Sequence, residues 1–436
     1  MPTPKTRHLK VVDKKYLWHP FTQMKDWLAD SNGPVIIDKA RGVYLYDTDG
    51  KCYIDGVSSL WVNVHGHGHP AIDKAIKKQV DRLSHSTLLG LANAPAVELS
   101  QKLIEIAPKG LAKVFYSDNG STAVEIALKQ AYQYWQNKGQ KNKRTLVHLA
   151  NSYHGDTLGS VSVGGIKLFH QVYQGLIFKT VALKSKGWGA VEDFRKLLEK
   201  RSGYIAALIV EPLVQGAAGM LLWPEGTLRE FRRLCDQYQV LLIVDEVATG
   251  FGRTGRMFAC QHEGVTPDFL CLAKGITGGY LPLAATLTTK KVYDGFLFDY
   301  KSQKTFFHGH TYTGNPLACA AALANLVVFQ KERTLEKLAP KIKFLAKQLK
   351  MFYNLTSVVE IRQCGFMVGI ELAGRWEDRL GAQVCQRARE SGVMLRPLGN
   401  VIVIMPPLII SEKQLQYLLE SIYKAISVIT RSKATK

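Results

Sequence analysis

A lysine follows a strand-like apolar run at a position where its amine could react. The run Phe269–Leu272 leads through Ala273 to Lys274, and two glycines, Gly278 and Gly279, come shortly after it. Burial lowers the pKa of a lysine and frees its amine to form a Schiff base with a carbonyl. Taken alone, Lys274 could also be a surface lysine whose alkyl stem lies on apolar neighbours.

Two carboxylates follow a second run of this kind. Asp245 and Glu246 come directly after Val240–Val244, and a parallel sheet opens its ligand crevice at the carboxyl ends of its strands. We expect one of the two carboxylates to face the ligand. The pair alone leaves open a structural cap or a metal ligand.

A third segment has the residues of an anion site. Tyr116–Thr122 links a short strand to the helix predicted over 123–135, and it contains Gly120 and Ser121. Backbone N–H groups and hydroxyls at a helix start can hold a phosphate, although a simple helix cap has the same composition. Neither a Walker A motif nor a strand-linked G-x-G-x-x-G accompanies it, which disfavours a mononucleotide kinase or a dehydrogenase. A covalent anchor, a carboxylate partner and a phosphate site together are the requirements of pyridoxal 5'-phosphate.

These segments belong to an alternation of apolar runs and amphipathic stretches between about residues 70 and 330. Continuous apolar runs of strand length are typical of strands buried on both faces. Alternation with helices predicts an α/β fold with a mainly parallel sheet covered on both sides. The predicted strands are 113–116, 145–149, 206–210, 240–244, 269–272 and 284–288.

The flanking regions show different patterns. Residues 1–65 have short strand-like runs, and Val43–Asp47 with the turn Asp49-Gly50 predicts a hairpin. After Glu332 the pattern predicts a long charged helix, strands over 361–371, 394–396 and 401–405, and a final helix. We therefore expect an N-terminal segment (1–65) that packs with the small domain, a large α/β domain (66–332) that binds the cofactor, and a small C-terminal α+β domain (333–436).

The composition limits the location and partners of the chain. Its longest nearly unbroken apolar run, Pro316–Phe329, contains Asn325 and is too short to span a membrane. With no secretory signal at the N-terminus, we expect a cytoplasmic protein without a membrane partner. The 436 residues include 57 Lys and Arg against 36 Asp and Glu, a net charge of +21. The positive residues form no aromatic-interleaved patch, so we expect no nucleic-acid partner, although a basic nucleic-acid-binding protein on an inactive fold remains the alternative from another class.

Four motifs across the chain resemble the class III aminotransferases, which are pyridoxal-phosphate enzymes of fold type I. The motifs are Tyr153–Asp156, Asp245–Gly255, Ala273–Gly275 and Gly309–Pro316. The resemblance implies that Lys274 anchors the cofactor, that Asp245 keeps the pyridine nitrogen protonated, and that Tyr153 stacks on the ring opposite Val247. It also implies a homodimer with the active site at its interface. Phosphate binding is implied for Gly120 and Ser121, with His310 and Thr311 also at the cofactor and Thr311 contributed by the partner subunit.

Two N-terminal motifs narrow the resemblance. Trp18–Met24 and Ser58–Trp61 are similar to the branch that aminates 8-amino-7-oxononanoate to 7,8-diaminononanoate in biotin synthesis. This implies substrate contacts from Phe21, Leu60, Trp61 and Gly309, and it implies that Arg396 holds the substrate carboxylate, as suits a guanidinium fork. Another ω-aminotransferase acting on a different amine is the nearest alternative.

Four positions depart from the family pattern. Ala217 stands where glutamate-using relatives often carry a Glu, which disfavours their chemistry. Branch members that use S-adenosylmethionine commonly have Tyr, Trp and Pro in place of Phe21, Leu60 and His310, whereas the residues here resemble those of members that use lysine. We therefore expect S-adenosylmethionine or lysine as the amino donor.

The alternating run His65, His67 and His69 could suggest a metal site. Its glycines and Pro70 predict a loop, in which the three rings need not share a face. We expect no metal there, and we expect His308 and His310 to line the cleft.

Overall fold

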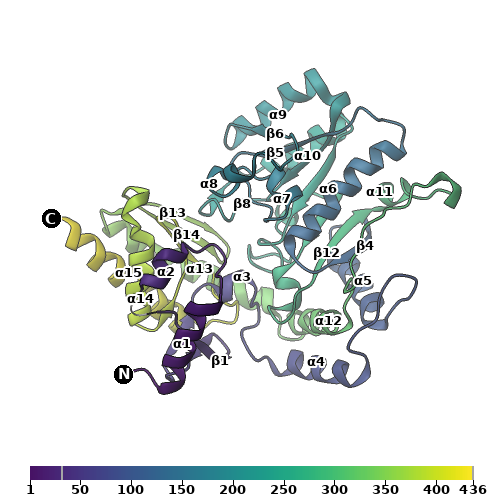
Figure 1. Ribbon diagram of the computed structural model, residues 1–436. Coiled ribbons are helices and arrows are strands. Elements are labelled where there is room, and N and C mark those ends of the chain that lie inside the picture. The colour runs from purple at the N-terminus through teal and green to yellow at the C-terminus, as the bar shows by residue number, and fades with distance from the viewer. Residues whose placement is uncertain (31–32, 435–436) are drawn as a thin grey trace.

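In the computed structural model, which describes residues 1–30 and 33–434, a seven-stranded sheet forms the centre of the protein (Figure 1). All neighbouring pairs are parallel except those that β12 makes with β11 and β4. The six strands predicted from the apolar runs are confirmed, and only the short edge strand β6 was not predicted. The spatial order is β4 (Leu111–Ser117), β12 (Ala284–Thr289), β11 (Phe269–Leu272), β10 (Leu241–Asp245), β7 (Ile205–Val210), β5 (Thr145–Leu149) and β6 (Val181–Leu183).

Successive residues of the central strands enter two different cores. In β10, Leu241 and Ile243 pack with helix α6 (Gly120–Asn137). Leu242 and Val244 belong to a second core, which also contains residues of α9 (Trp188–Arg201) and α10 (Thr227–Gln237). Because both faces are buried, these strands are apolar throughout and hold their carboxyl ends rigidly.

Further helices complete the part of the chain around the large sheet. They are α4 (Pro70–Arg82), α5 (Ala94–Ile106), α7 (Leu158–Ser162), α8 (Lys167–His170), α11 (Lys290–Asp294) and α12 (Pro316–Lys331), with the hairpin β8 (Val214–Gln215) and β9 (Leu221–Leu222). Among the described residues, none of the helices combines the length and the apolar character needed to cross a membrane.

A second sheet lies in the C-terminal region, in the order β13 (Val358–Cys364), β14 (Met367–Leu372), β17 (Val401–Ile404) and β16 (Pro397–Leu398). The long charged helix is confirmed as α13 (Thr334–Leu349), followed by α14 (Leu380–Glu390) and α15 (Glu412–Ala434). The single strand predicted over 361–371 is wrong, because the chain turns back at Gly365 to form a hairpin. Gly365 has φ +61°, and a Cβ there would lie 2.5 Å from the Arg253 carbonyl oxygen.

The N-terminal region differs from the β-rich prediction because it begins with two helices, α1 (Pro4–Tyr16) and α2 (Met24–Ala29). Thr3 caps α1 and Pro4 occupies its first turn, a helix-start signal that the strand-like runs further along obscured. The predicted hairpin is confirmed: β2 (Tyr44–Asp47) pairs with β3 (Cys52–Asp55), and β1 (Ile37–Arg41) completes its edge.

Strand β3 pairs in parallel with β15 (Val393–Met394), so the two ends of the chain share one sheet. Figure 1 shows α1 and α2 beside the C-terminal helices, and Asp26 of α2 forms an ion pair with Arg379 next to α14. The three-part division at about residues 65 and 332 remains our proposal, and this pairing supports it.

Candidate active site

A cavity of about 1370 Å³ opens at the carboxyl ends of the central strands. Ten of the predicted site residues line it, and they come from both ends of the chain as well as from the large sheet. They are Phe21, Leu60, Trp61, Gly120, Ser121, Tyr153, Asp245, Val247, Lys274 and Arg396.

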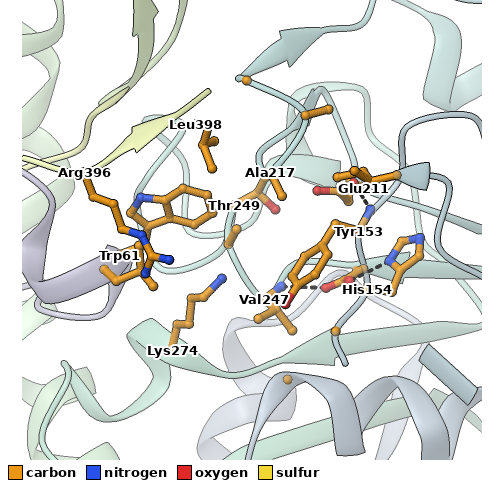
Figure 2. Close-up of a pocket in the computed structure, with 18 of the residues that line it drawn as sticks. Trp61, Tyr153, His154, Glu211, Ala217, Val247, Thr249, Lys274, Arg396 and Leu398 are labelled. Atoms are coloured by element: carbon orange, nitrogen blue, oxygen red, sulfur yellow. Dashed lines mark hydrogen bonds and ion pairs between the residues drawn. The ribbon is translucent and has the colours of Figure 1, made fainter. Parts of the chain in front are cut away.

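Lys274 follows β11 at the start of a 3-10 turn, η4 (Lys274–Thr277), and has a positive φ of +46°. Figure 2 shows its side chain pointing into the cavity, with its Nζ 4.8 Å from the ring centroid of Trp61. Burial lowers the pKa of Lys274, and the charges of Asp245 and Glu211 act in the opposite direction. A lysine amine with a lowered pKa in a cleft is a nucleophile and a proton acceptor.

The two carboxylates that end β10 have different surroundings. Asp245 lines the cavity, where its Oδ2 lies 2.7 Å from Nδ1 of His154 and its Oδ1 accepts a hydrogen bond from the Val247 N–H. Glu246 is fully buried, does not line the cavity, and accepts hydrogen bonds from the backbone N–H groups of Ala259 and Cys260. Asp245 is therefore the carboxylate available to a ligand, and Glu246 holds the following loop.

The ring of Tyr153 faces the cavity near Val247 and Lys274 (Figure 2). Its hydroxyl donates to Asp156 at 2.7 Å, and its backbone N–H donates to Glu211. Burial, followed by the neighbouring Asp156, raises the pKa of Tyr153, so the phenol stays neutral. These bonds fix the ring in place.

The start of α6 forms another part of the cavity wall. Asn119 caps this helix, while Gly120 and Ser121 carry its first N–H groups, which have no acceptor within the helix. A Cβ at Gly120 would lie 2.6 Å from Cγ1 of Val247, so only glycine leaves this close approach free. A phosphate at the helix start, a ring beside Tyr153 and Val247, and a carbonyl at Lys274 would all find matching groups here. The residues thus fit pyridoxal phosphate.

Arg396 and Phe21 lie together at another wall. The Arg396 guanidinium stands 5.8 Å above the Phe21 ring, and Arg396 takes part in no ion pair among those of the described residues. Phe21 in turn packs edge-on against Phe169 at 5.5 Å. An exposed, unpaired guanidinium beside apolar rings can bind the carboxylate of a ligand with an apolar chain.

Leu60 and Trp61 reach the cavity through an unusual turn. Four consecutive non-glycine residues, Ser58 to Trp61, have positive φ values between 41° and 73°. The Ser58 hydroxyl donates to the Met405 carbonyl and accepts from Nη2 of the buried Arg253. These long-range contacts hold the turn in a conformation that local preferences disfavour.

Gly309, His310 and Thr311 do not line this cavity. The backbone N–H of His310 donates to Thr313, and neighbouring His308 lies 3.0 Å from Nζ of Lys129. The expectation that His308 and His310 line the cleft is therefore wrong for the cavity of the same chain. The expected roles of Gly309, His310 and Thr311 stay predictions.

The three histidines of the alternating run have separate surroundings. His67 bonds to Asp55 and His69 to Glu332, each at 2.9 Å, while His65 is buried against Phe329. The structure therefore does not direct the three rings toward a common point.

Sequence reasoning did not assign roles to several residues that shape the site. His154 and Arg253 lie within the quoted motifs, and Glu211 begins the segment that contains Ala217. Glu211 accepts backbone bonds from Tyr153 and Gly216, and burial raises its pKa to about 7. His154, Arg253 and Glu211 could have been found from the sequence, because they lie in or next to the segments that contain Tyr153, Asp245 and Ala217.

Comparison with known proteins agrees with this geometry. A family model described as "Aminotransferase class-III" matches residues 28–426. The chain is 50% identical to adenosylmethionine-8-amino-7-oxononanoate aminotransferase of Geobacter sulfurreducens, over 99% of this chain and 100% of that one. The crystal structure of the Methanocaldococcus jannaschii enzyme of the same name superposes with a TM-score of 0.95 at 44% identity, covering 97% and 99% of the two chains.

A more distant structure bears on the cofactor. An amine transaminase from an uncultivated Pseudomonas species, solved with pyridoxal phosphate bound, has a TM-score of 0.90 and 32% identity over 95% of this chain and 99% of that chain. The predicted α/β fold is confirmed by these neighbours. The chain belongs to the class III aminotransferases, so the enzyme class and the pyridoxal phosphate cofactor expected from its motifs are confirmed.

Proposed function

We propose that this protein transfers an amino group to 8-amino-7-oxononanoate and forms 7,8-diaminononanoate, a step of biotin biosynthesis. The observation that carries the proposal is the high identity, over nearly the whole chain, to relatives that bear the name of this reaction. The site supports it with two features at one cavity, a reactive Lys274 and an unpaired Arg396 for the substrate carboxylate.

We propose the following roles around the cofactor. When bound, pyridoxal phosphate supplies a carbonyl for covalent linkage to amines and a ring that accepts electrons. Asp245 holds a proton at the ring nitrogen and is itself oriented by His154. Lys274 would anchor the group through Nζ, and the incoming donor amine would displace it. The freed lysine amine would then take the proton from the amine-bearing carbon of the donor, and in the second half of the reaction it would deliver a proton to the acceptor carbon. Tyr153 and Val247 hold the ring from its two faces.

Phosphate binding is proposed for Gly120 and Ser121 of one subunit and for Thr311, with His310, of a partner subunit. The segment that carries Thr311 lies outside the cavity of its own chain. The exposed aromatic rings of Phe307 and Tyr312 in that segment are suited to burial by a second copy. We therefore propose a homodimer in the cytoplasm, in which Gly309 of the partner also contacts the substrate.

At the substrate end, we propose that Arg396 binds the carboxylate and that Phe21, Leu60 and Trp61 enclose the methylene chain. The same residues bear on the donor. Leu60 places no indole at its own position beside Trp61, so an adenosyl group would have one stacking surface fewer there than in branch members with two adjacent tryptophans. The donor is S-adenosylmethionine or lysine, and the relatives' names support the former.

The visible spectrum of the purified, cofactor-loaded protein tests this proposal. It is titrated separately with 7,8-diaminononanoate, S-adenosylmethionine, lysine and glutamate. We expect conversion of the lysine-linked band to the amine form of the cofactor by diaminononanoate and by one of the next two amines. Conversion by glutamate or an unrelated amine alone would refute the biotin assignment, and the absence of any lysine-linked band would refute the role of Lys274.

A further inference from the structure

Helix α12 contains a buried amide among apolar residues. Asn325 has no exposed surface, and the other buried residues of this helix are Pro316, Ala318, Cys319, Ala321, Ala322, Val328 and Phe329. A polar side chain in such surroundings destabilises the fold unless it forms hydrogen bonds. The partners of Asn325 therefore indicate why the amide is there.

Both hydrogen bonds of the Asn325 amide go to the turn that begins with Lys274. Its Nδ2 donates to the carbonyl oxygens of Gly275 at 2.9 Å and of Ile276 at 3.1 Å. These are the two residues that follow Lys274 in η4, and both are buried. The last carbonyls of so short a turn have few internal partners. Helix α12 therefore supplies a donor for the Ile276 carbonyl and a second donor for the Gly275 carbonyl.

Gly278, which ends the same turn, also lies against Asn325. Gly278 has φ +65°, and a Cβ on it would lie 2.8 Å from Oδ1 of Asn325. The N–H of Gly278 returns to the Gly275 carbonyl at 3.0 Å. Asn325 thus contacts the peptide groups after Lys274 and the glycine that ends the turn.

Lys274 itself has φ +46°, in the left-handed region that favours glycine. Such a conformation persists only where surrounding contacts impose it. We propose that Asn325 is a positioning residue for Lys274: by fixing the turn from behind, it sets where the lysine amine lies relative to the cofactor and the migrating proton. This inference rests on the role proposed for Lys274, but it does not depend on which amine is the substrate.

The test compares Asn325→Leu, which removes the donor at similar volume, with Val328→Ala as a matched control. Val328 is buried in the same helix, where it packs with Ile72 and Ala321, and its apolar side chain forms no hydrogen bond with the turn. In the loaded enzyme we measure kcat and KM with an amine that converts the lysine-linked band of the wild type, and we measure the pH midpoint of that absorbance band. In the cofactor-free protein we measure hydrogen exchange of the amides of residues 274–278.

For Asn325→Leu we expect kcat to fall about tenfold or more while KM stays within about twofold, because a small displacement of a reacting group slows chemistry more than binding. The pH midpoint should shift, and the amides should exchange about tenfold faster or more. Val328→Ala should lower thermal stability and leave these three quantities unchanged. If Asn325→Leu does not fold, Asn325→Ser, with a donor of shorter reach, should show the same changes to a smaller degree.

The inference is overturned if the Asn325 variants match Val328→Ala in kcat, pH midpoint and exchange, or if kcat falls while the other two quantities stay unchanged. Failure of the proposed function looks different. A Lys274→Ala variant that retained a reducible covalent adduct would remove the assumed role of Lys274, whatever the Asn325 variants did.

Discussion

Replacing Arg396 with alanine should weaken binding of the oxo substrate and leave the chemical step intact. Arg396 forms none of the ion pairs among the described residues, so its removal leaves no internal carboxylate unpaired. A hydrogen-bonded charge contributes about 1.5–3 kcal/mol. Because Arg396 is exposed, solvent reduces this contribution, and we take about 1.5–2 kcal/mol. At about 1.4 kcal/mol per tenfold change, KM for 8-amino-7-oxononanoate should rise about 10- to 30-fold.

The assay measures kcat and KM for this substrate at a saturating, fixed concentration of donor. Arg387→Ala, which removes an exposed arginine of α14 paired with Glu390 outside the cavity, is the matched control and should change neither constant. An amino ketone of the same length without the carboxylate should be used equally well by wild type and Arg396→Ala. An equal loss for both substrates would show that Arg396 does not recognise the carboxylate, and a fall in kcat alone would contradict a binding role.

Three further variants test other parts of the site. Lys274→Ala should abolish the covalent adduct that borohydride reduction traps in the wild type, as intact-mass measurement would show, and a persistent adduct would contradict the assignment. Gly120→Ala should weaken cofactor binding at least about tenfold by fluorescence titration, because the added Cβ meets Val247 at 2.6 Å; unchanged affinity would place the phosphate elsewhere. Glu211 has a pKa raised to about 7 from 4.5, so its contribution to the stability of the cofactor-free protein is present below pH 4.5 and is lost as pH rises through 7. Glu211→Gln should therefore flatten the fall in melting temperature over that range, and a fall as steep as in wild type would contradict the raised pKa.

The elements predicted best from the sequence are the strands whose residues are buried on both faces, because that burial alone determines their pattern of apolar residues. The strands that end at Asp245 and before Lys274 are buried on both faces, and a continuous apolar run indicates such a strand without further information. The carboxyl ends of these strands then had to meet, which brought the lysine and the carboxylate into one cavity.

Features that depend on distant contacts could not be predicted in this way. The left-handed turn at Ser58–Trp61 is held by Arg253 and Met405, which lie far along the chain, and neither local propensity nor periodicity indicates it. The place of Thr311 is a similar case, because its expected contact involves a second copy. The missed helix α1 differs, since its cap at Thr3 was visible in the sequence but the strand-like runs after it dominated the interpretation.

The sheet shared by β3 and β15 has a consequence for how this enzyme can be recombined with its relatives. Phe21, Leu60 and Trp61 come from the first part of the chain and Arg396 from the last, yet the β3–β15 pairing joins their two segments. A chimera that exchanges only the C-terminal region would combine Arg396 from one parent with Phe21, Leu60 and Trp61 from the other. Its β3–β15 strand pair would likewise be formed by strands from two different parents. On the substrate roles proposed for these residues, we expect transplantation of substrate preference to require exchange of both chain ends as one unit, with the central sheet left as a common scaffold.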